Sequence, residues 1–272
     1  MHTAEFYELL TKEYSLILAT TREDIQAVRT IRENVYSLKY NKPLEYLDSI
    51  GLIQDKDDEQ AFIYLLQHNT TKKYVGTVRV FFINKHTSSQ VLPMQQTVKD
   101  KHVFTLLQDL PVIEITRSAL TPEIPKHEIY SELALRTSLT YGLMIATRVT
   151  LMLYHPYLVF SIMEPTLHRI LRRQKVNFEP ISDSVDSYGT LRIPYAIKTN
   201  KLLGDTEENM GKLTKYYLKQ MCENPEKLWQ FVDNNAYLDR SDIHLERICK
   251  LFKEYGDDVD IALLLGEDQV LE

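Results

Sequence analysis

The chain has 272 residues, of which 44% are hydrophobic and 10% aromatic, and its formal net charge at pH 7 is −6. This composition excludes a disordered chain and is enough for one full core with an appendage. The acidic balance argues against a general nucleic-acid binder, and no apolar run approaches the ~20 residues that span a bilayer. The first residues lack the basic and apolar segments of a signal peptide, so we expect a soluble, cytoplasmic protein.

The first 83 residues predict a strand, a helix and a hairpin, in that order. Residues 14–19 are typical of a strand, and Thr20 with Glu23 predicts a capping box for the helix that follows. That helix carries Arg32 beside an apolar stripe, which consists of Ile25, Val28, Ile31, Val35 and Leu38. The runs 60–66 and 73–83 flank a polar turn and predict a hairpin, in which Arg79 points toward the sheet.

The run 111–120 is typical of a strand, but it carries charge where a buried strand is normally apolar. Alternation places Glu114, Thr116 and Ser118 on one face and Ile113, Ile115 and Arg117 on the other. A buried ionised side chain is costly unless it is paired, so Glu114 and Arg117 require either partners or a water-filled cleft. A structural ion pair and a catalytic site both satisfy this requirement.

The rest of the chain predicts further helices and strands. We expect a helix at about 126–145, a strand at 148–154, a helix at 164–175 and strands at 176–181 and 191–197. Beyond about residue 200 the pattern changes to short helices, at 208–222, 225–237 and 241–255. We therefore predict a mixed α/β (α+β) domain at 1–200 with a central mixed sheet flanked by helices. A C-terminal helical extension at 201–272 follows, which packs on the core, caps a tunnel or binds a partner.

Four motifs in order resemble those of a known family. They are Arg32-Glu-Asn-Val-Tyr36, Asp55-Lys-Asp-Asp58, Gly76-Thr-Val-Arg-Val80 and Glu114-Ile-Thr-Arg117. This series resembles acyl-homoserine-lactone (autoinducer) synthases and their relatives in the GNAT acyltransferase superfamily. The stretches 163–171 and 189–195 are more similar to the branch of N-acyl amino acid synthases and exosortase-associated acyltransferases. The resemblance covers about residues 10–200 and implies a GNAT-like domain there.

The resemblance also implies the site residues. It places Glu114, Thr116 and Arg117 at the reaction centre, with Thr116 where the family often has serine. It assigns substrate binding to five further residues: Arg32, Tyr36, Asp55, Asp58 and Arg79. Tyr36 replaces the family's usual phenylalanine, and the family's tryptophan after the first helix is missing. A solvated acidic loop is the alternative interpretation of Asp55 to Glu59.

The reaction that the resemblance implies moves a fatty acyl group from an acyl-carrier-protein thioester to the amine of an amino acid or similar small acceptor. Attack is direct, Glu114 is the candidate general base, and backbone N–H groups stabilise the thioester oxygen. The alternatives are an acyl-homoserine-lactone synthase that uses S-adenosylmethionine, and a non-catalytic acyl-binding or sensor module on the same fold. A product assay with both kinds of acceptor separates them.

The donor is expected to arrive on a carrier protein, because the segment 121–127 has no glycine and two prolines where ordinary GNAT enzymes cradle coenzyme A. The phosphopantetheine thioester is then a co-substrate, and no tightly bound cofactor is expected. A basic group could dock the acidic carrier protein, although a solvated helix face is an equal alternative. This group consists of Arg148, Arg169, Arg172, Arg173 and Lys175.

Other kinds of site have weaker signals. The eight histidines form no metal-binding pattern, so we predict no metal site. Cys222 and Cys249 have a spacing typical of neither a zinc site nor a disulfide framework, and we expect both thiols to be reduced. No serine lies in a Gly-x-Ser-x-Gly elbow, and no cysteine lies near the four motifs, so covalent catalysis has no candidate.

Overall fold

The computed structural model describes residues 3–83, 91–99, 102–105, 110–173, 175–204 and 208–266. The chain forms two compact units, one of residues 1–79 and 117–147 and the other of residues 80–116 and 148–272. Three elements contribute residues to both units: β3 (Tyr74–Ile83), β4 (Val112–Leu120) and α5 (Glu132–Tyr154). Residue 200, the predicted domain boundary, is not a boundary of these units.

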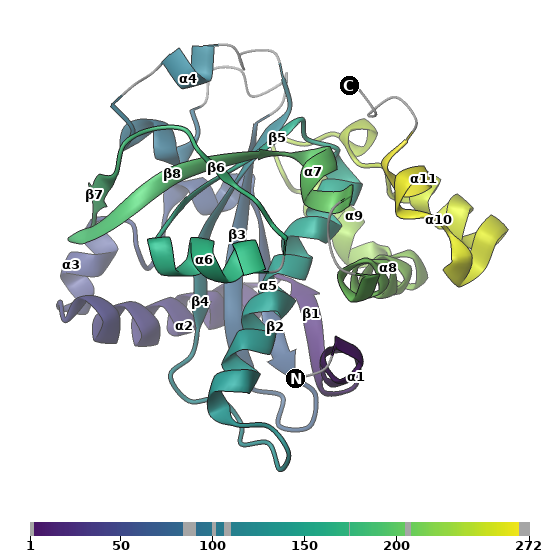
Figure 1. Ribbon diagram of the computed structural model, residues 1–272, viewed down its shortest axis with the longest axis horizontal. Coiled ribbons are helices and arrows are strands. Elements are labelled where there is room, and N and C mark those ends of the chain that lie inside the picture. The colour runs from purple at the N-terminus through teal and green to yellow at the C-terminus, as the bar shows by residue number, and fades with distance from the viewer. Residues whose placement is uncertain are drawn as a thin grey trace. The chain divides into compact units, whose positions relative to one another are not determined.

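The strands form an eight-stranded sheet (Figure 1). Its hydrogen-bonded order is β1 (Tyr14–Leu18), β2 (Ala61–His68), β3, β4, β5 (Leu158–Met163), β8 (Thr190–Lys198) and β6 (Glu179–Pro180), and β7 (Val185–Ser187) pairs with β8 off this path. β1 and β2 are antiparallel, as are β5 and β8, whereas β4 and β5 are parallel. Apart from the N-terminal helix and the short helices, the order is a strand, a helix, three strands, a helix, a strand, a helix and three further strands. This agrees with the predicted order of element types, although not with every predicted boundary. The predicted mixed α/β fold class, with a mixed central sheet and flanking helices, is therefore confirmed.

The first unit contains the N-terminal elements and the turn into α5. Its remaining elements are α1 (Thr3–Glu13), β1 (Tyr14–Leu18), α2 (Arg22–Tyr40), α3 (Leu44–Ser49), the 3-10 helix η1 (Lys56–Gln60) and β2 (Ala61–His68). The predicted strand at 14–19, the helix after it and the hairpin are confirmed within one or two residues. The helix α1 was not predicted.

The core of the first unit lies between α2, α3 and β2. Val28, Ile31 and Tyr36 of α2 pack there with Leu47 and Ile63. The predicted apolar stripe of α2 is partly wrong, because Ile25 is 44% and Leu38 70% exposed. The capping box is also shifted by one residue: the cap is Thr21, whose side chain accepts a hydrogen bond from the Asp24 amide while the Asp24 carboxylate accepts from the Thr21 amide.

The second unit contains the remaining elements. They are η3 (Pro93–Gln96), α4 (His102–Thr105), β5 (Leu158–Met163), α6 (Pro165–Arg173), β6 (Glu179–Pro180), β7 (Val185–Ser187), β8 (Thr190–Lys198), α7 (Thr199–Gly204), α8 (Glu208–Glu223), α9 (Glu226–Asp233), η4 (Arg240–Asp242), α10 (Leu245–Tyr255), η5 (Gly256–Asp258) and α11 (Ile261–Leu265). Among the described residues, none of the helices is both long and apolar enough to cross a membrane.

The predicted strand at 148–154 is wrong, because these residues continue α5 to Tyr154 and the strand that follows is β5. Residues 149–154 are all buried, so this helix end is covered on every side. A helix buried on every side and a buried strand look alike in sequence, because neither shows a polar face.

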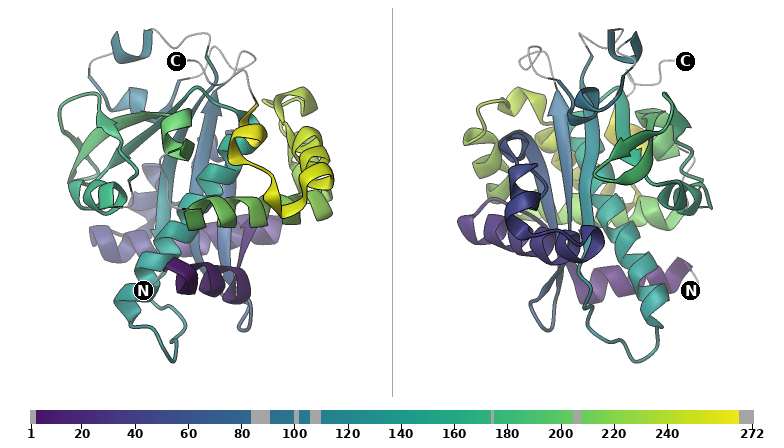
Figure 2. Two further views of the ribbon diagram at one scale, coloured as in Figure 1. Left: turned by 45° about the vertical axis from the view of Figure 1, so that its right-hand side comes forward. Right: turned by 90° about the vertical axis from the view of Figure 1, so that its left-hand side faces the viewer.

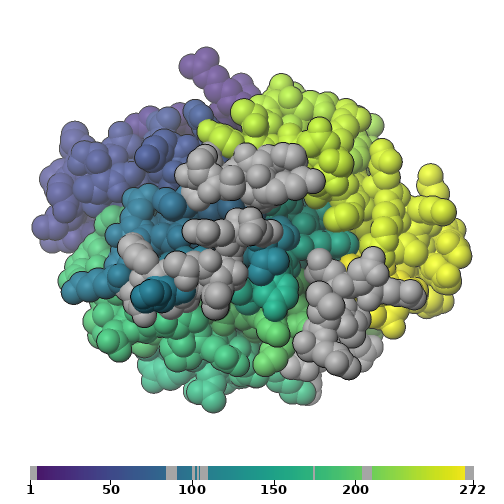
Figure 3. All heavy atoms as spheres, turned by 90° about the horizontal axis from the view of Figure 1, so that it is seen from above, coloured from purple at the N-terminus to yellow at the C-terminus, as the bar shows by residue number. Residues whose placement is uncertain are grey.

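The C-terminal helices α8 to α11 lie beside one another (Figure 2), and in the space-filling view their yellow-green and yellow atoms form one continuous region of surface (Figure 3). Helices α8 and α10 are joined by a disulfide between Cys222 and Cys249, whose Cα atoms are 5.3 Å apart. The expectation of two reduced thiols is therefore wrong in this structure. The cause is tertiary packing, which brings two helices together that sequence spacing does not relate.

Candidate active site

Three arginines and two aspartates from separate segments meet in the first unit. Arg32 comes from α2, Arg79 from β3 and Arg117 from β4, and all three bind the segment between α3 and β2. That segment carries Asp55 and Asp58. We call these five residues the Arg–Asp network. The four predicted motifs are thus represented in it.

Arg32 holds Asp58 through two parallel hydrogen bonds. Its Nη1 lies 2.6 Å from Asp58 Oδ2 and its Nη2 lies 3.1 Å from Asp58 Oδ1. The same Nη1 also donates to the carbonyl oxygen of Ile53 at 3.1 Å. Two-pronged pairing of this kind fixes the carboxylate in both position and orientation.

Arg79 links the two aspartates, and Arg117 fastens the start of the segment. Arg79 Nη1 lies 3.0 Å from Asp55 Oδ2 and 3.1 Å from Asp58 Oδ1. Arg117 Nη2 lies 3.1 Å from Asp55 Oδ2 and 2.6 Å from the carbonyl oxygen of Gly51. The alternative of a solvated acidic loop is therefore wrong for Asp55 and Asp58.

The network is buried, and its pKa values respond to that burial. Arg32 and Arg79 are each 1% exposed, and the side chains of Asp55 and Asp58 are 13% and 17% exposed. Burial alone would raise the pKa of Asp55, but Arg79, the Asp57 amide and Arg117 together lower it below its ordinary value. Burial and the neighbouring Asp55 raise the pKa of Asp57 instead. Asp55 is thus kept as a carboxylate.

The backbone at Arg117 is unusual for a strand residue. Its φ is +54°, in the left-handed region, although the residue lies inside β4. A non-glycine residue in this conformation costs of order 1–3 kcal/mol and persists where its surroundings hold it, often at functional sites. The carbonyl oxygen of Gly51 accepts a hydrogen bond from the Arg117 guanidinium. Gly51 also has a positive φ, of +69°, a conformation that glycine adopts without strain. The predicted strict alternation of β4 therefore ends at Arg117.

Glu114 and Thr116 belong to the second unit and are described there. Glu114 is 2% exposed, and its Oε2 accepts a hydrogen bond from the Met94 amide at 2.8 Å. The parallel pairing of β4 with β5 includes Ile115 opposite Ser161, whose Oγ donates to the Ile115 carbonyl. Thr116, the next residue of β4, is half-buried. Glu114 is thus a buried carboxyl group near the end of the stretch that pairs with β5.

Two predicted binding residues lie in packing positions instead. Tyr36 is 6% exposed and packs in the apolar core of the first unit. Arg148 is 1% exposed and donates to Thr214 Oγ1 and to the carbonyl oxygens of Leu202 and Leu203. Its inclusion in a docking surface was wrong, because a carrier protein cannot reach it.

The other four basic residues of the predicted docking group are exposed. Arg169, Arg172 and Arg173 lie on α6, and Lys175 follows two residues after its end. Leu171 of the same helix is buried, so α6 turns an apolar side inward and these cations outward. This arrangement supplies a basic surface in the second unit.

Sequence reasoning missed several contacts of the site. It gave no role to the carbonyls of Gly51 and Ile53, which bind Arg117 and Arg32, because backbone groups leave no residue-type signal. It also missed the Met94 amide, which holds Glu114. In the part of the chain that the structure describes, no three His, Cys, Asp or Glu side chains gather closely enough to hold a metal ion.

Comparisons with known proteins give matches among solved structures alone. No protein-family model matches the chain, and no curated protein matches it. The structure of FeeM, an N-acyl amino acid synthase from uncultured soil microbes, has 12% sequence identity and a TM-score of 0.49, covering 75% of this chain and 97% of that chain. The AHL synthase LasI has 10% identity and a TM-score of 0.47, covering 71% and 96%. BjaI, a CoA-dependent acyl-homoserine lactone synthase, has 15% identity and a TM-score of 0.46, covering 70% and 85%.

Proposed function

We propose that this protein is an N-acyltransferase, which moves a fatty acyl group from an acyl-carrier-protein thioester to the amine of an amino acid or a similar small acceptor. The proposal starts from the four motifs that resemble N-acyl amino acid synthases. The observation that carries it is the Arg–Asp network, which gathers one or two charged residues from each of those motifs. Burying two guanidinium groups to 1% exposure costs free energy of folding. A buried ion pair seldom stabilises a protein more than well-packed apolar side chains at the same positions would.

The network holds two carboxylates in fixed orientations, and both remain partly accessible to solvent. Asp55 and Asp58 keep 13% and 17% of their side chains accessible, whereas Arg32 and Arg79, which hold them, are each 1% exposed. We assign Asp55 and Asp58 to the ammonium group of the acceptor. Arg32 and Arg79 position these carboxylates, and Arg117 fastens the segment through Gly51.

Glu114 is assigned the removal of a proton from the attacking amine, directly or through one water. The Met94 amide holds one of its carboxylate oxygens, which fixes the orientation of the group. We assign the stabilisation of the thioester oxygen to backbone N–H groups of β4 after Ile115, beside Thr116. The amine then attacks the thioester carbon, and the pantetheine thiol leaves with a proton.

The proposed donor is a carrier protein rather than free coenzyme A. The turn before α5 has Pro122 and Pro125, and the Ala134 amide in the first turn of the helix is already bonded to the Ser131 hydroxyl. Fewer backbone N–H groups are therefore available to bind an anion there than at an open helix N-terminus. The exposed cations of α6 and Lys175 offer a complementary surface for an acidic carrier protein.

A product assay tests the proposal. The pure protein is incubated with acyl carrier protein that carries a decanoyl thioester, together with a panel of amino acids or with S-adenosylmethionine, and the products are identified by mass spectrometry. We expect an N-acyl amino acid. A lactone would identify an acyl-homoserine-lactone synthase, and no product with any acceptor would contradict the proposed acyl transfer.

The same assay tests the donor and the docking surface. Arg169→Glu with Arg172→Glu and Arg173→Glu should raise KM for the carrier protein by about tenfold, because charge complementarity is reversed. Lys227→Glu on α9 with Lys250→Glu and Lys253→Glu on α10 is the matched control and should leave KM unchanged. Equal KM values for both variants would remove α6 from docking, and faster turnover with decanoyl coenzyme A would overturn the carrier-protein donor.

We place this reaction in the cytoplasm, as the sequence leads us to expect. The Cys222–Cys249 disulfide is unusual for that compartment, where such bonds are mostly transient or redox-sensing. Trapping the thiols by acid quenching and alkylation in whole cells measures their state directly. A fully oxidised pair in the cell would contradict a cytoplasmic location, and a reduced or partly reduced pair would agree with it.

A further inference from the structure

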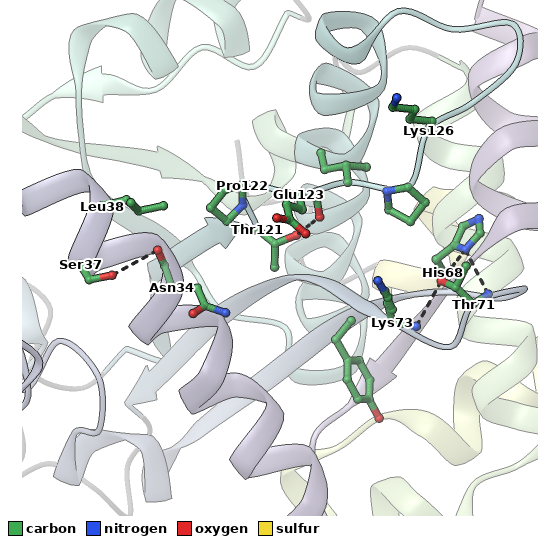
Figure 4. Close-up of a pocket in the computed structure, with 13 residues that line it drawn as sticks. Asn34, Ser37, Leu38, His68, Thr71, Lys73, Thr121, Pro122, Glu123 and Lys126 are labelled. Carbon is green, nitrogen blue, oxygen red and sulfur yellow. Dashed lines mark hydrogen bonds between the residues drawn. The ribbon is translucent and has the colours of Figure 1, made fainter.

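A hollow of about 840 Å³ lies in the first unit, formed by three segments (Figure 4). Helix α2 contributes Asn34, Ser37 and Leu38. The hairpin of β2 and β3 contributes His68 at the end of β2, Thr71 and Lys73 in the turn, and Tyr74 at the start of β3. The third wall is the loop 121–126, which follows β4. The volume lies within the range of about 300–1,000 Å³ that is usual for small-molecule sites.

The walls combine an apolar surface with a rigid loop. Leu38 is 70% exposed and points toward Pro122 in Figure 4, and Tyr74 and Ile124 add further apolar surface. Pro122 and Pro125 restrict the backbone of the loop, and the hydroxyl of Thr121 bonds to the carbonyl oxygens of Val75 and Glu123. The loop is therefore held in place without a ligand, as is usual for binding sites.

The charge of the lining is opposite to that of the whole protein. Lys73 and Lys126 line the hollow, and neither forms an ion pair with another described residue. Glu123 is the one carboxylate among the described lining residues, although acidic residues outnumber basic ones by 38 to 32 in the chain. His68 adds a donor, because its Nδ1 accepts the Thr71 amide and its neutral ring then carries the proton on Nε2.

This hollow is separate from the Arg–Asp network, and none of its lining residues belongs to that network. Both sites include residues of β3, namely Tyr74 and Arg79, which are five positions apart. At ~3.3 Å per residue this separation is about 17 Å along the strand. A ligand of ordinary size in the hollow therefore occupies a second site in the first unit.

We propose that the hollow binds a small anion with an apolar body, such as a fatty acid or an alkyl phosphate. Lys73, Lys126 and His68 bind the anionic head, and Leu38, Pro122 and Ile124 contact the body. The shared chemistry is one negative head group on an alkyl chain. This inference is independent of the proposed acyl transfer, since it rests on the lining of the hollow alone.

Lysine footprinting tests the proposal at the level of single residues. The full-length protein is treated briefly with an acetylating reagent in the presence of decanoate, decyl phosphate or 1-decanol, and the acetylation rate of each lysine is measured by mass spectrometry. We expect an anionic probe at saturation to slow acetylation of Lys73 and Lys126 by about tenfold. The neutral alcohol should have little effect, and Lys227 on α9 is the exposed control.

The two anionic probes distinguish the head groups. Protection by decanoate alone supports a carboxylate ligand, protection by decyl phosphate alone supports a phosphate ligand, and protection by both supports the shared chemistry. Unchanged rates at Lys73 and Lys126 with both anions would overturn the proposal, as would equal protection by 1-decanol. Turnover is not measured, so a failure of the proposed acyltransferase activity does not affect the result.

Two variants locate the protected site. Asn34→Trp fills the hollow from an exposed position of α2 and keeps both lysines, so protection should disappear. Asn177→Trp, at an exposed position in the second unit, is the matched control and should keep it. Leu38→Asp places a negative charge on the wall and should weaken decanoate binding by about tenfold. Protection that persists in both Asn34→Trp and Leu38→Asp would show that the probe binds elsewhere.

Discussion

The two units stabilise buried charge in different ways. In the first unit, Arg79 is 1% exposed and is neutralised by the carboxylates of Asp55 and Asp58. In the second unit, Arg148 is equally buried but binds only a hydroxyl and two carbonyl oxygens in the contacts described above. Burial lowers the pKa of Arg148 to about 10.

This difference indicates that Arg79 belongs to a candidate site, whereas Arg148 has a structural role. The contacts of Arg79 orient two partly accessible carboxylates, whereas the contacts of Arg148 satisfy carbonyls at the end of α7 and tie them to α8. The C-terminal part of the second unit is further held by a disulfide and by the stacked rings of His155 and His244, whose centroids are 4.0 Å apart. We therefore expect the stability of the first unit to depend on ion pairs. The stability of the C-terminal helices should depend instead on the disulfide, on ring stacking and on the hydrogen bonds of Arg148.

Removal of Arg79 should have the largest effect on stability. Arg79→Met leaves Asp55 and Asp58 with one fewer partner each and breaks a buried charge network, so we expect a loss of about 4 kcal/mol in the free energy of unfolding. Urea denaturation followed by circular dichroism measures this loss. Arg22→Met, at an exposed first-turn position of α2, is the control and should change stability by less than about 0.5 kcal/mol. A loss below about 1 kcal/mol for Arg79→Met would show that the network contributes little.

Loss of the disulfide should have the next largest effect and should be confined to the second unit. Cys222 and Cys249 are separated by 27 positions, and opening a loop of that length corresponds to about 3.5 kcal/mol in the chain-entropy model. Cys222→Ser with Cys249→Ser should therefore lower the unfolding free energy by about this amount. Hydrogen exchange should speed up in α8 and α10 and remain unchanged in α2. Faster exchange in α2 would contradict the separation of the two regions.

Removal of Arg148 should cost less than removal of Arg79. Arg148→Met leaves the Leu202 and Leu203 carbonyls and the Thr214 hydroxyl with fewer partners, but it also removes a buried charge. We expect a net loss of about 2 kcal/mol, measured in the same urea titration. Lys250→Met on the exposed face of α10 serves as the control. A loss equal to that of Arg79→Met would remove the distinction between paired and carbonyl-bound arginines.

Acid should destabilise the protein through His155. Burial, together with His244 and Arg247, lowers the pKa of His155 from 6.5 to about 3. Well above pH 6.5 the ring is neutral in both the folded and the unfolded chain, so the His155 ring does not lower the free energy of unfolding there. As the pH falls toward 3, the unfolded chain binds a proton that the folded chain does not, so stability falls by up to about 1.4 kcal/mol per pH unit.

The His155→Gln variant should make this slope shallower between pH 6 and pH 4, because glutamine does not bind the proton. His244, whose pKa burial also lowers, retains part of the slope. Unfolding free energies measured at several pH values in both proteins give the comparison. Equal slopes in the wild type and in His155→Gln would contradict the depressed pKa of His155.

Much of the fold was predictable from the sequence because the helices are amphipathic and the strands are rich in β-branched residues. β2, β3 and β4 follow from apolar runs between turn residues, and α2 from its periodic stripe. The end of α5 was not predictable, because residues 149–154 are buried on all sides and show no period. The exposure of Ile25 and Leu38 depends on which part of α2 the sheet covers, and periodicity alone does not encode that.

The candidate site was predictable in its residues but only partly in its contacts. Arg32, Asp55, Asp58, Arg79 and Arg117 were identified through the resemblance, and they meet as a network. Arg148 was misassigned to an exposed docking surface, since an arginine in a basic group carries no signal of its burial. Tyr36 is buried in the apolar core, and its role in substrate binding stays a prediction. The disulfide joins two helices across 27 positions, and local spacing holds no information about their packing.

The most direct test of the account is the turnover of Glu114→Gln in the decanoyl-carrier-protein assay. Glutamine keeps the shape of the side chain and can still accept the Met94 amide, but it cannot accept a proton. We expect turnover to fall by a factor on the order of 10²–10⁴, with carrier-protein binding nearly unchanged and the protein still folded. A folded Glu114→Gln protein that turns over at the wild-type rate at every pH would contradict the assignment of Glu114 as the base.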